Sequence, residues 1–350
     1  GRKVIFVAEV VEVRVPASTA NLGPGFDAVG MAIELFNVVR MGTTSTTGLE
    51  ITVLGDSRDL PVDWTNLVAR SAATFFEEVG LPVPGLRIHV QQRIPVSRGL
   101  GSSAAAIVAG LVGANALAGF PLNDDDLFRL AAEIEGHPDN VGAALFGGLV
   151  VSVADERGRL RYLKMGVPAD LHLAIVIPDF HVPTEVARRV LPKSVTLADA
   201  VHNIGRTALL VASIASGRLD LLGDAMADKL HQPYRSALVP GLDNVLASAM
   251  QAGALGAALS GSGPSVVAFA KQDPQRVAKA MAATFAASGV KCRAVVTRVC
   301  QRGAAVGMGC DSGAPSKGLP GEDSPFRVRT ALRRMRPSRR RALYRGEVYS

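Results

Sequence analysis

The segment from residue 86 to residue 117 constrains the fold more than any other part of the chain. Residues 86–92 (LRIHVQQ) alternate between apolar and polar side chains, which predicts a strand. Residues 102–117 are small and apolar on all sides, which predicts a buried helix. The Gly- and Ser-rich sequence PVSRGLGSSAAA joins the two. A strand that leads through a glycine loop into a buried helix predicts a domain of mixed α and β structure.

This glycine loop is suited to hold an anion. Glycines let the backbone fold tightly, and the free N–H groups and positive dipole end of a new helix favour phosphate oxygens. Ser102 and Ser103 add hydroxyls that can contact phosphate or Mg²⁺. The loop has neither the Gly-Lys-Ser/Thr ending of a Walker loop nor the G-x-G-x-x-G pattern of a dinucleotide site. Because a Gly-Ser cap on a core helix explains the same residues, the loop alone leaves both interpretations open.

Two further segments bear on that choice. Residues 16–27 (PASTANLGPGFD) predict a loop between strands, longer than the about two to five residues of an ordinary hairpin connection. The excess length, with Asn21 and Asp27 on it, indicates a function. Residues 259–265 (LSGSGPS) are another Gly/Ser turn between apolar strands, for which a plain tight turn is the simpler interpretation.

Apolar periodicity divides the 350 residues into two units and a tail, and the length exceeds that of one usual hydrophobic core. In the first unit we expect strands at 3–15, 31–39, 49–55, 86–92 and near 148–154, and helices at 65–79, 102–117 and 124–134. In the second we expect a strand at 171–177, helices at 183–190, 196–215 and 241–251, and then strand, turn, strand, helix and strand, ending near residue 298. The fold class is therefore predicted as α+β with two domains, at 1–163 and 164–302. The remainder, 303–350, is rich first in Gly, Pro and Ser and then in Arg, and predicts a disordered basic tail.

The net charge of +7 suggests nucleic-acid binding until it is divided along the chain. Residues 301–350 hold 11 Lys and Arg against 4 Asp and Glu, so the totals of 38 and 31 leave 27 of each sign in residues 1–300. Any polyanion affinity would belong to the tail, and we expect no nucleic-acid partner for the folded body. With no run of about 18 uncharged apolar residues, we expect a soluble, cytoplasmic protein without a membrane partner. The oligomeric state is left open, with a homodimer as one expectation.

Together the three Gly-containing segments resemble the signature motifs of the superfamily of galactokinase, homoserine kinase, mevalonate kinase and phosphomevalonate kinase. Their order and approximate spacing match. The sequences PASTANLGPGFDAVG at 16–30, EGHPDN at 135–140, HVPTEVARRVLP at 181–192 and HQPYR at 231–235 are most similar to the homoserine kinases. The resemblance covers about residues 10–300, and the tail departs from it.

The resemblance implies an N-terminal nucleotide-binding α/β domain and a C-terminal ferredoxin-like α/β sandwich that share a cleft. The phosphates of ATP would lie against Pro95, Ser97, Arg98, Gly99, Leu100, Gly101, Ser102, Ser103, Ala104 and Ala105, with Gly261 and Gly263 in a supporting glycine loop. Ser103 and Glu135 would hold Mg²⁺, a cation that prefers oxygen ligands; a solvated carboxylate at a helix end is the alternative for Glu135. Asn66 matches a position near the adenine, although Thr65-Asn66 also suits a helix cap.

The acceptor that the resemblance implies is L-homoserine, phosphorylated on its hydroxyl to O-phospho-L-homoserine in threonine biosynthesis. A zwitterionic amino acid needs cations for its carboxylate and an anion for its ammonium. Arg188 and Arg235 on one side and Asp27 on the other would supply these charges. Arg189 is the alternative to Arg188, which we prefer because it follows Thr184 by four residues on one helix face. The polar remainder would be Asn21, His137, Thr184 and Asn140, and a structural role is the alternative for His137.

The catalytic base is left open. The catalytic candidates are Glu135, Asp139 and Asn140. Mevalonate-type relatives use an aspartate, for which Asp139 is the nearest candidate, whereas homoserine kinases are thought to rely on positioning, with Asn140 contacting the reacting hydroxyl. A loose transition state for phosphoryl transfer tolerates this. The remaining alternatives are another kinase of the superfamily and a catalytically silent ligand-binding member, and the intact phosphate loop argues against silence.

Overall fold

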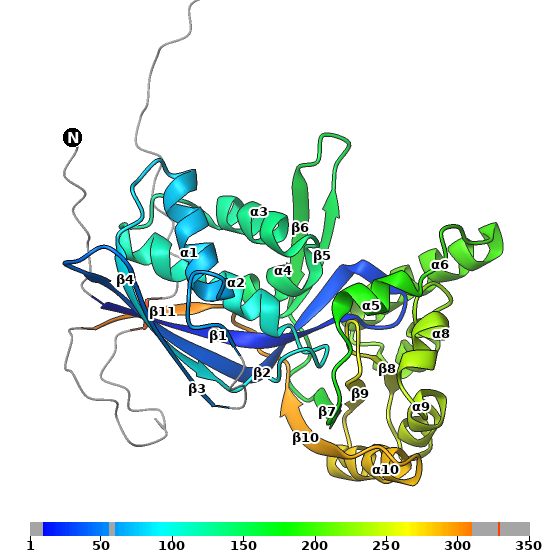
Figure 1. The fold of residues 1–350 in the computed structure, drawn as a ribbon. Coiled ribbons are helices and arrows are strands. Elements are labelled where there is room, and N and C mark those ends of the chain that lie inside the picture. Colours follow the sequence, from blue (N-terminus) through cyan, green and yellow to red (C-terminus); the bar gives the residue numbers. More distant parts are fainter. Residues whose placement is uncertain (1–9, 56–59, 310–327, 330–350) are drawn as a thin grey trace, which may run out of the picture.

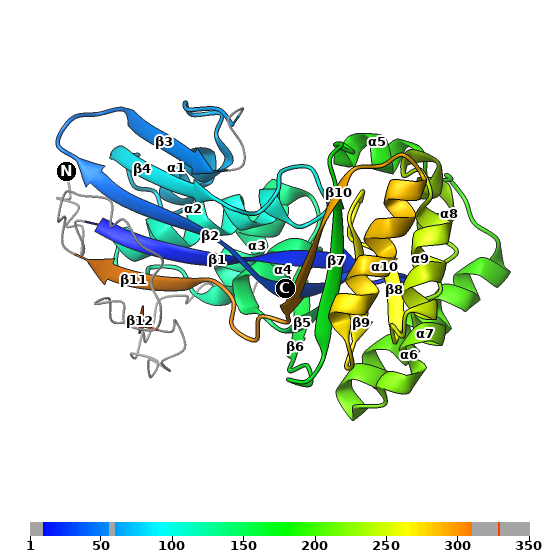
Figure 2. The ribbon, with the colours of Figure 1, turned by 90° about the horizontal axis from the view of Figure 1, so that it is seen from below.

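The computed structural model describes residues 10–55, 60–309 and 328–329, which form two sheets of unequal size (Figure 1). The larger sheet contains β1 (Val10–Asn21), β2 (Gly25–Thr44), β3 (Leu49–Gly55), β4 (Gly85–Gln92), β5 (Leu149–Ala154), β6 (Leu160–Met165), β11 (Ala305–Gly309) and β12 (Val328–Arg329). Its main path is β12-β11-β1-β2-β4-β3, and the β5–β6 hairpin pairs with the first part of β2. The long strands β1 and β2 continue from this sheet toward the C-terminal half (Figure 2).

Helices cover one face of the larger sheet (Figure 1). They are α1 (Leu67–Glu78), α2 (Ser102–Leu117), α3 (Asp124–Glu135) and α4 (Asp139–Phe146). Almost all of α2 is buried, as its apolar sequence predicts, and small residues let α1 approach it closely. A side chain at Gly110 would place its Cβ 2.4 Å from the Val68 carbonyl oxygen on α1. The phosphate loop therefore leads into a helix held between the sheet and its neighbours.

The smaller sheet has the order β10-β7-β9-β8 and is antiparallel throughout. Its strands are β7 (His172–Pro178), β8 (Gly256–Leu259), β9 (Val266–Ala270) and β10 (Cys292–Arg298). The helices of this half are α5 (Thr184–Arg189), α6 (Leu197–Ser216), α7 (Leu222–Ala225), α8 (Gln232–Arg235), α9 (Leu242–Gln251) and α10 (Pro274–Ala287). Two short 3-10 helices, η1 (Leu219–Leu221) and η2 (Ser236–Leu238), lie among them. Strand, helices, two strands, helix and strand in this sheet order are a ferredoxin-like arrangement. The α+β class and the ferredoxin-like C-terminal half are confirmed.

The second half of β1 serves as an attachment edge for loops. Strand β11 pairs with β1 only over Val10–Arg14, and no other described strand continues on that side. Beyond this point the Ser18 N–H donates to the Leu100 carbonyl at 3.2 Å, and the Ala20 carbonyl accepts from the Gly261 N–H at 3.1 Å. Two glycine loops far apart in sequence are thus fixed to one strand.

The long loop predicted at 16–27 is wrong. Strand β1 continues to Asn21 and β2 begins at Gly25, so the connection is a tight turn in which Asn21 and Leu22 have positive φ. Pro16 is accommodated because the β1–β2 register shifts between Pro16 and Ala17, and a bulge is where a strand tolerates proline. The proline and glycine residues that suggested a loop belong to a bulged strand and the tight turn that follows it.

Both predicted domain boundaries also differ from the limits of the strands in the structure. The boundary between 163 and 164 falls inside β6, which ends at Met165. The predicted tail is wrong for its first residues, because β11 pairs with β1 and Val306 is buried; its short Gly-rich sequence hides this from a periodicity analysis. Of the rest of 303–350, all but residues 328–329 lies outside the described part of the chain. Helices α4, α7 and α8 and strand β6 were not predicted. In the ranges described, no helix has the length and apolar character needed to cross a membrane.

We expect a chain that ends at Arg302 to be less stable than a chain that ends at Arg329. The shorter chain loses the β1–β11 pairing and the buried Val306 side chain, which should lower the melting temperature by about 3–8 °C. Differential scanning calorimetry of the two chains measures the difference. Equal melting temperatures would show that β11 contributes no stability.

Candidate active site

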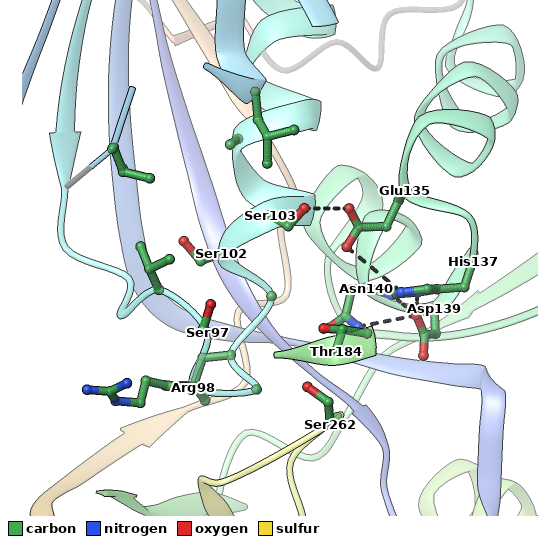
Figure 3. A pocket seen from close by; sticks show the side chains of 18 of the residues that line it. Ser97, Arg98, Ser102, Ser103, Glu135, His137, Asp139, Asn140, Thr184 and Ser262 are labelled. Carbon is green, nitrogen blue, oxygen red and sulfur yellow. Dashed lines mark hydrogen bonds and ion pairs between the residues drawn. The ribbon is translucent and has the colours of Figure 1, made fainter. Parts of the chain in front are cut away.

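A cavity of about 360 Å³ lies between the two halves of the protein and is lined by residues from both. Of the residues predicted for the site, those that do not line it are Pro95, Ala104, Ala105 and Gly263. All the others do, including Ser97 to Ser103 of the phosphate loop, the predicted residues of the EGHPDN segment, Thr184, and both Arg188 and Arg235. Figure 3 shows the loop residues on one side of the cavity and the Glu135–Asn140 group on the other.

Glycines shape the phosphate loop because other segments press against it. Gly99 and Gly101 have φ of 74° and 66°, and Gly101 caps α2. A Cβ at Gly99 would lie 2.1 Å from the Ser260 carbonyl oxygen, and one at Gly101 would lie 2.0 Å from Ser18 Oγ. The loop leads into the sixteen-residue helix α2, whose free N–H groups and positive dipole end suit an anion.

The end of the cavity beside α1 is apolar. Its apolar lining residues are Leu60, Pro61, Leu67, Val68, Val90 and Val96, with Ala106 of α2, and the polar Thr65, Asn66 and Gln92 line the cavity as well. Such a wall suits the flat face of a nucleotide base. Asn66 lies at this wall as the cap of α1: its Oδ1 accepts from the Val68 N–H at 3.0 Å and its Nδ2 donates to the Pro61 carbonyl at 2.8 Å. The cap that the sequence offered as an alternative is present, and the apolar wall itself was not predicted, because scattered apolar residues are indistinguishable from core.

Ser103 and Glu135 meet across the cavity. The Ser103 hydroxyl donates to Glu135 Oε2 at 2.6 Å (Figure 3), and Glu135 is the last residue of α3. Burial raises the pKa of Glu135 and the nearby Asp139 charge adds to this, whereas the Ser103 hydrogen bond and His137 oppose it. A cation at this carboxylate would relieve the cost of burying it. The described residues contain no cluster of three or more His, Cys, Asp or Glu that could hold a metal by itself.

Asp139 organises its neighbours at the start of α4. Its Oδ1 accepts from the Asn140 N–H at 2.6 Å and from Asn140 Nδ2 at 3.2 Å, and it lies 2.7 Å from His137 Nδ1. Burial lowers the pKa of His137, but the hydrogen bond to Asp139 and the Asp139 and Glu135 charges outweigh it, so the net shift is upward. Since one carboxylate oxygen already serves three donors, the arrangement favours Asp139 as a structural acceptor.

Arg188 and Asp27, which were predicted to bind opposite ends of the acceptor, contact each other directly in this structure. Arg188 donates through both terminal nitrogens to the two oxygens of Asp27, each at 2.9 Å. Arg188 lines the cavity, whereas Arg189 is exposed and does not. Sequence reasoning could assign the charges but not this direct pairing, because 161 residues separate the partners.

Arg235 is buried and held by the backbone. Its Nε donates to the Ala187 carbonyl at 3.1 Å and its Nη1 donates to the Gly261 carbonyl at 3.0 Å. Burial lowers the pKa of Arg235 to about 10, and the Arg188 charge contributes. The guanidinium lies 5.3 Å from the centre of the Phe26 ring.

His231 supports this arginine and was not predicted. Its Nε2–H donates to the Gly23 carbonyl at 2.6 Å, which leaves Nδ1 to accept from Arg235 Nη1 at 3.3 Å. Burial lowers the pKa of His231, in agreement with a neutral ring. Asn21 is likewise engaged in structure, since Nδ2 donates to the Gly261 carbonyl and Oδ1 accepts from the Asp27 N–H, both at 3.1 Å.

The fold and the site agree with the protein-family matches, which identify the class of protein as the GHMP kinases. Residues 66–148 match the GHMP kinases N terminal domain, and residues 210–287 match the GHMP kinases C terminal family. L. major mevalonate kinase has the same fold, with a TM-score of 0.66 at 16% identity over 85% of this chain and 99% of that one.

Relatives with higher sequence identity identify the family within this class. Over 295 residues the chain is 48% identical to the homoserine kinase of Moorella thermoacetica, which covers 84% of this chain and 99% of the relative. The crystal structure of homoserine kinase from Cytophaga hutchinsonii has a TM-score of 0.79 and 35% identity over 87% of this chain and 100% of that one. The chain belongs to the homoserine kinase family.

We expect His137 to titrate above its ordinary pKa of 6.5. A raised folded-state pKa means that this histidine stabilises the fold fully below its unfolded pKa and loses that contribution as the pH rises through the folded value. In Asp139→Asn the pKa should fall, because the carboxylate charge is removed and at most a weaker, neutral hydrogen bond remains while burial is unchanged. Histidine NMR titration, with assignment from His137→Gln, measures both values. If the pKa of His137 were the same in Asp139→Asn, Asp139 could not be the group that raises it.

Proposed function

We propose that this protein transfers the γ-phosphoryl group of ATP to the hydroxyl of L-homoserine and releases ADP and O-phospho-L-homoserine. The observation that carries the proposal is that one cavity is lined both by a glycine loop opening a long helix and by the charges of Asp27, Arg188 and Arg235. The names of the relatives agree with this combination of a phosphate site and a zwitterion site.

The donor would occupy the side of the cavity that joins the apolar wall to the start of α2. Its base would pack against the wall beside Asn66, and its phosphates would meet the N–H groups of the loop from Ser97 to Ser103. Figure 3 shows Ser102 and Ser103 at the first turn of α2, with Ser97 below them. An extended ligand placed in this way would direct its last phosphate toward Glu135.

Magnesium fits the donor set at this point. Ser103 and Glu135 offer a hydroxyl and a carboxylate in contact, and burial raises the pKa of Glu135 even though His137 lies 4.0 Å away, so a further cation would stabilise this carboxylate. Mg²⁺ usually takes one or two protein oxygens and completes its shell with phosphates and water. When bound, it would neutralise charge on the transferred phosphoryl group.

The acceptor would lie on the side of the two arginines. Its carboxylate would be bound by Arg188 and Arg235, and its ammonium would pair with Asp27 in place of part of the present Asp27–Arg188 contact. Thr184, at the first turn of α5, lines the same region. A zwitterion can replace this ion pair because it brings both charges, whereas a ligand with one charge leaves a partner unpaired.

Transfer in this site needs positioning more than proton removal. The bond between the γ-phosphorus and the ADP oxygen breaks and leaves its electron pair on ADP, while the homoserine oxygen bonds to phosphorus and the hydroxyl proton passes to water. Three hydrogen-bond donors share Asp139 Oδ1, so we assign this oxygen to holding His137 and Asn140. Asn140, which lines the cavity, would contact the acceptor hydroxyl.

We expect kcat/KM to be at least tenfold higher for homoserine than for mevalonate, with galactose poorer still. Mevalonate would compete for Arg188 without offering Asp27 a cation, and because the pair is about one-third exposed the cost is about 1–3 kcal/mol. An ADP-release assay with the three acceptors measures this, and chelation of Mg²⁺ should abolish turnover. Equal efficiency with mevalonate would end the homoserine assignment.

Variants of Arg235 provide the control. Arg235→Leu should raise the homoserine KM strongly and leave the ATP KM almost unchanged, because the contact is at the acceptor end. Arg235→Lys should recover only part of the loss, since one ammonium group cannot donate to the Ala187 and Gly261 carbonyls and also reach the ligand as the planar guanidinium does. An increase in the ATP KM alone, with the homoserine KM unchanged, would show that Arg235 does not bind the acceptor.

A further inference from the structure

We propose that Ser18 is a positioning residue for phosphoryl transfer, which holds the Asn140 amide at a fixed place against the phosphate loop. The proposal rests on the function proposed above, in which Asn140 contacts the acceptor hydroxyl. It assigns a role in the reaction to a residue on β1 that does not line the cavity itself.

Ser18 connects three separate parts of the protein at one point. Its backbone N–H donates to the Leu100 carbonyl of the phosphate loop at 3.2 Å. Its hydroxyl donates to Asn140 Oδ1 at 2.8 Å, across 122 residues of sequence. A Cβ at Gly101 would lie 2.0 Å from Ser18 Oγ and 3.1 Å from Asn140 Oδ1, so the loop, the strand and α4 are in contact there. Ser18 thus ties the donor side of the cavity to the acceptor side.

The direction of these hydrogen bonds determines what Asn140 can do. Asp139 Oδ1, a carboxylate oxygen, can only accept, so the Asn140 atom 3.2 Å from it is the amide nitrogen. The amide oxygen is therefore the atom that accepts from Ser18. One amide hydrogen is used by Asp139, and the other remains for a ligand. Asn140 can then donate to one lone pair of the acceptor hydroxyl and leave another lone pair to attack phosphorus, but it cannot remove the proton.

Burial alone does not explain the bond between Ser18 and Asn140. Ser71 is also fully buried, and its hydroxyl has no hydrogen-bond partner within the described ranges. Ser260, fully buried too, donates to the Gly99 carbonyl and accepts from the Thr19 hydroxyl, so it supports the loop without touching Asn140. Among these buried serines, Ser18 is the one whose hydroxyl holds a side chain that lines the cavity.

The test is a double-variant cycle on the full chain with ATP, Mg²⁺ and homoserine. Ser18→Ala should lower kcat by roughly 10- to 100-fold, with both KM values within about threefold of the parent, because misplacement of a reacting group is felt in the transition state. Asn140→Ala should lower kcat at least as much. The double variant should match Asn140→Ala alone, since Ser18 acts through Asn140. Ser18→Cys, with a weaker donor of similar size, should fall between the parent and Ser18→Ala.

Ser71→Ala is the matched control, because it removes a buried hydroxyl on α1 that makes no contact with the cavity; its kcat should equal that of the parent. A normal kcat in Ser18→Ala, or losses that multiply in the double variant, would overturn the proposal.

A structural readout separates this proposal from the proposed function. In a crystal structure of Ser18→Ala, the Asn140 amide should be displaced or occupy two positions. A single unchanged position would overturn the positioning role whatever the substrate is. Failure of the parent protein to phosphorylate homoserine would instead overturn the proposed function, and the crystal structure would still decide on Ser18.

Discussion

The unpaired edge of β1 beyond Arg14 is the constraint on which the site depends. No described strand covers this edge, so its buried N–H and C=O groups need other partners, and each left unsatisfied would cost about 1–3 kcal/mol. The Ser18 N–H takes the phosphate loop as its partner and the Ala20 carbonyl takes the Gly261 turn. Satisfying the backbone of one strand therefore brings together two loops whose contacting residues, Gly99 and Ser260, lie 161 residues apart.

Charged side chains determine what the side of the cavity with the two arginines can bind. Arg188 and Arg235 both lie near the Phe26 ring, at 5.6 and 5.3 Å from its centre, and Asp27 is the carboxylate that pairs with Arg188. The lowered pKa of Arg235 records the cost of burying it beside a second cation, yet at about 10 the group stays charged at neutral pH. A ligand carboxylate would offset that cost. The protein thus keeps a positive site ready by fixing it to backbone carbonyls rather than to a second acid.

Most of the architecture follows from sequence, and the failures have local causes. Continuous apolar runs identified α2 and β7, alternation of apolar and polar residues identified β4, and a glycine loop before an apolar helix indicated the candidate phosphate site. Strand β1 beyond Pro16 was missed because proline and glycine there accompany a bulge and a tight turn. The direct contacts of Arg188 with Asp27 and of Ser18 with Asn140 depend on tertiary structure, and no local pattern encodes them.

The most direct test of this mechanism is a crystal structure of the protein with a non-hydrolysable ATP analogue, Mg²⁺ and homoserine. We predict phosphates at the N-terminus of α2, the metal between Ser103 and Glu135, and the homoserine carboxylate on Arg188 and Arg235. The acceptor hydroxyl should then lie in line with the terminal phosphate and within hydrogen-bond distance of Asn140 Nδ2. Homoserine bound away from the arginines, or a hydroxyl out of reach of Asn140, would contradict the mechanism.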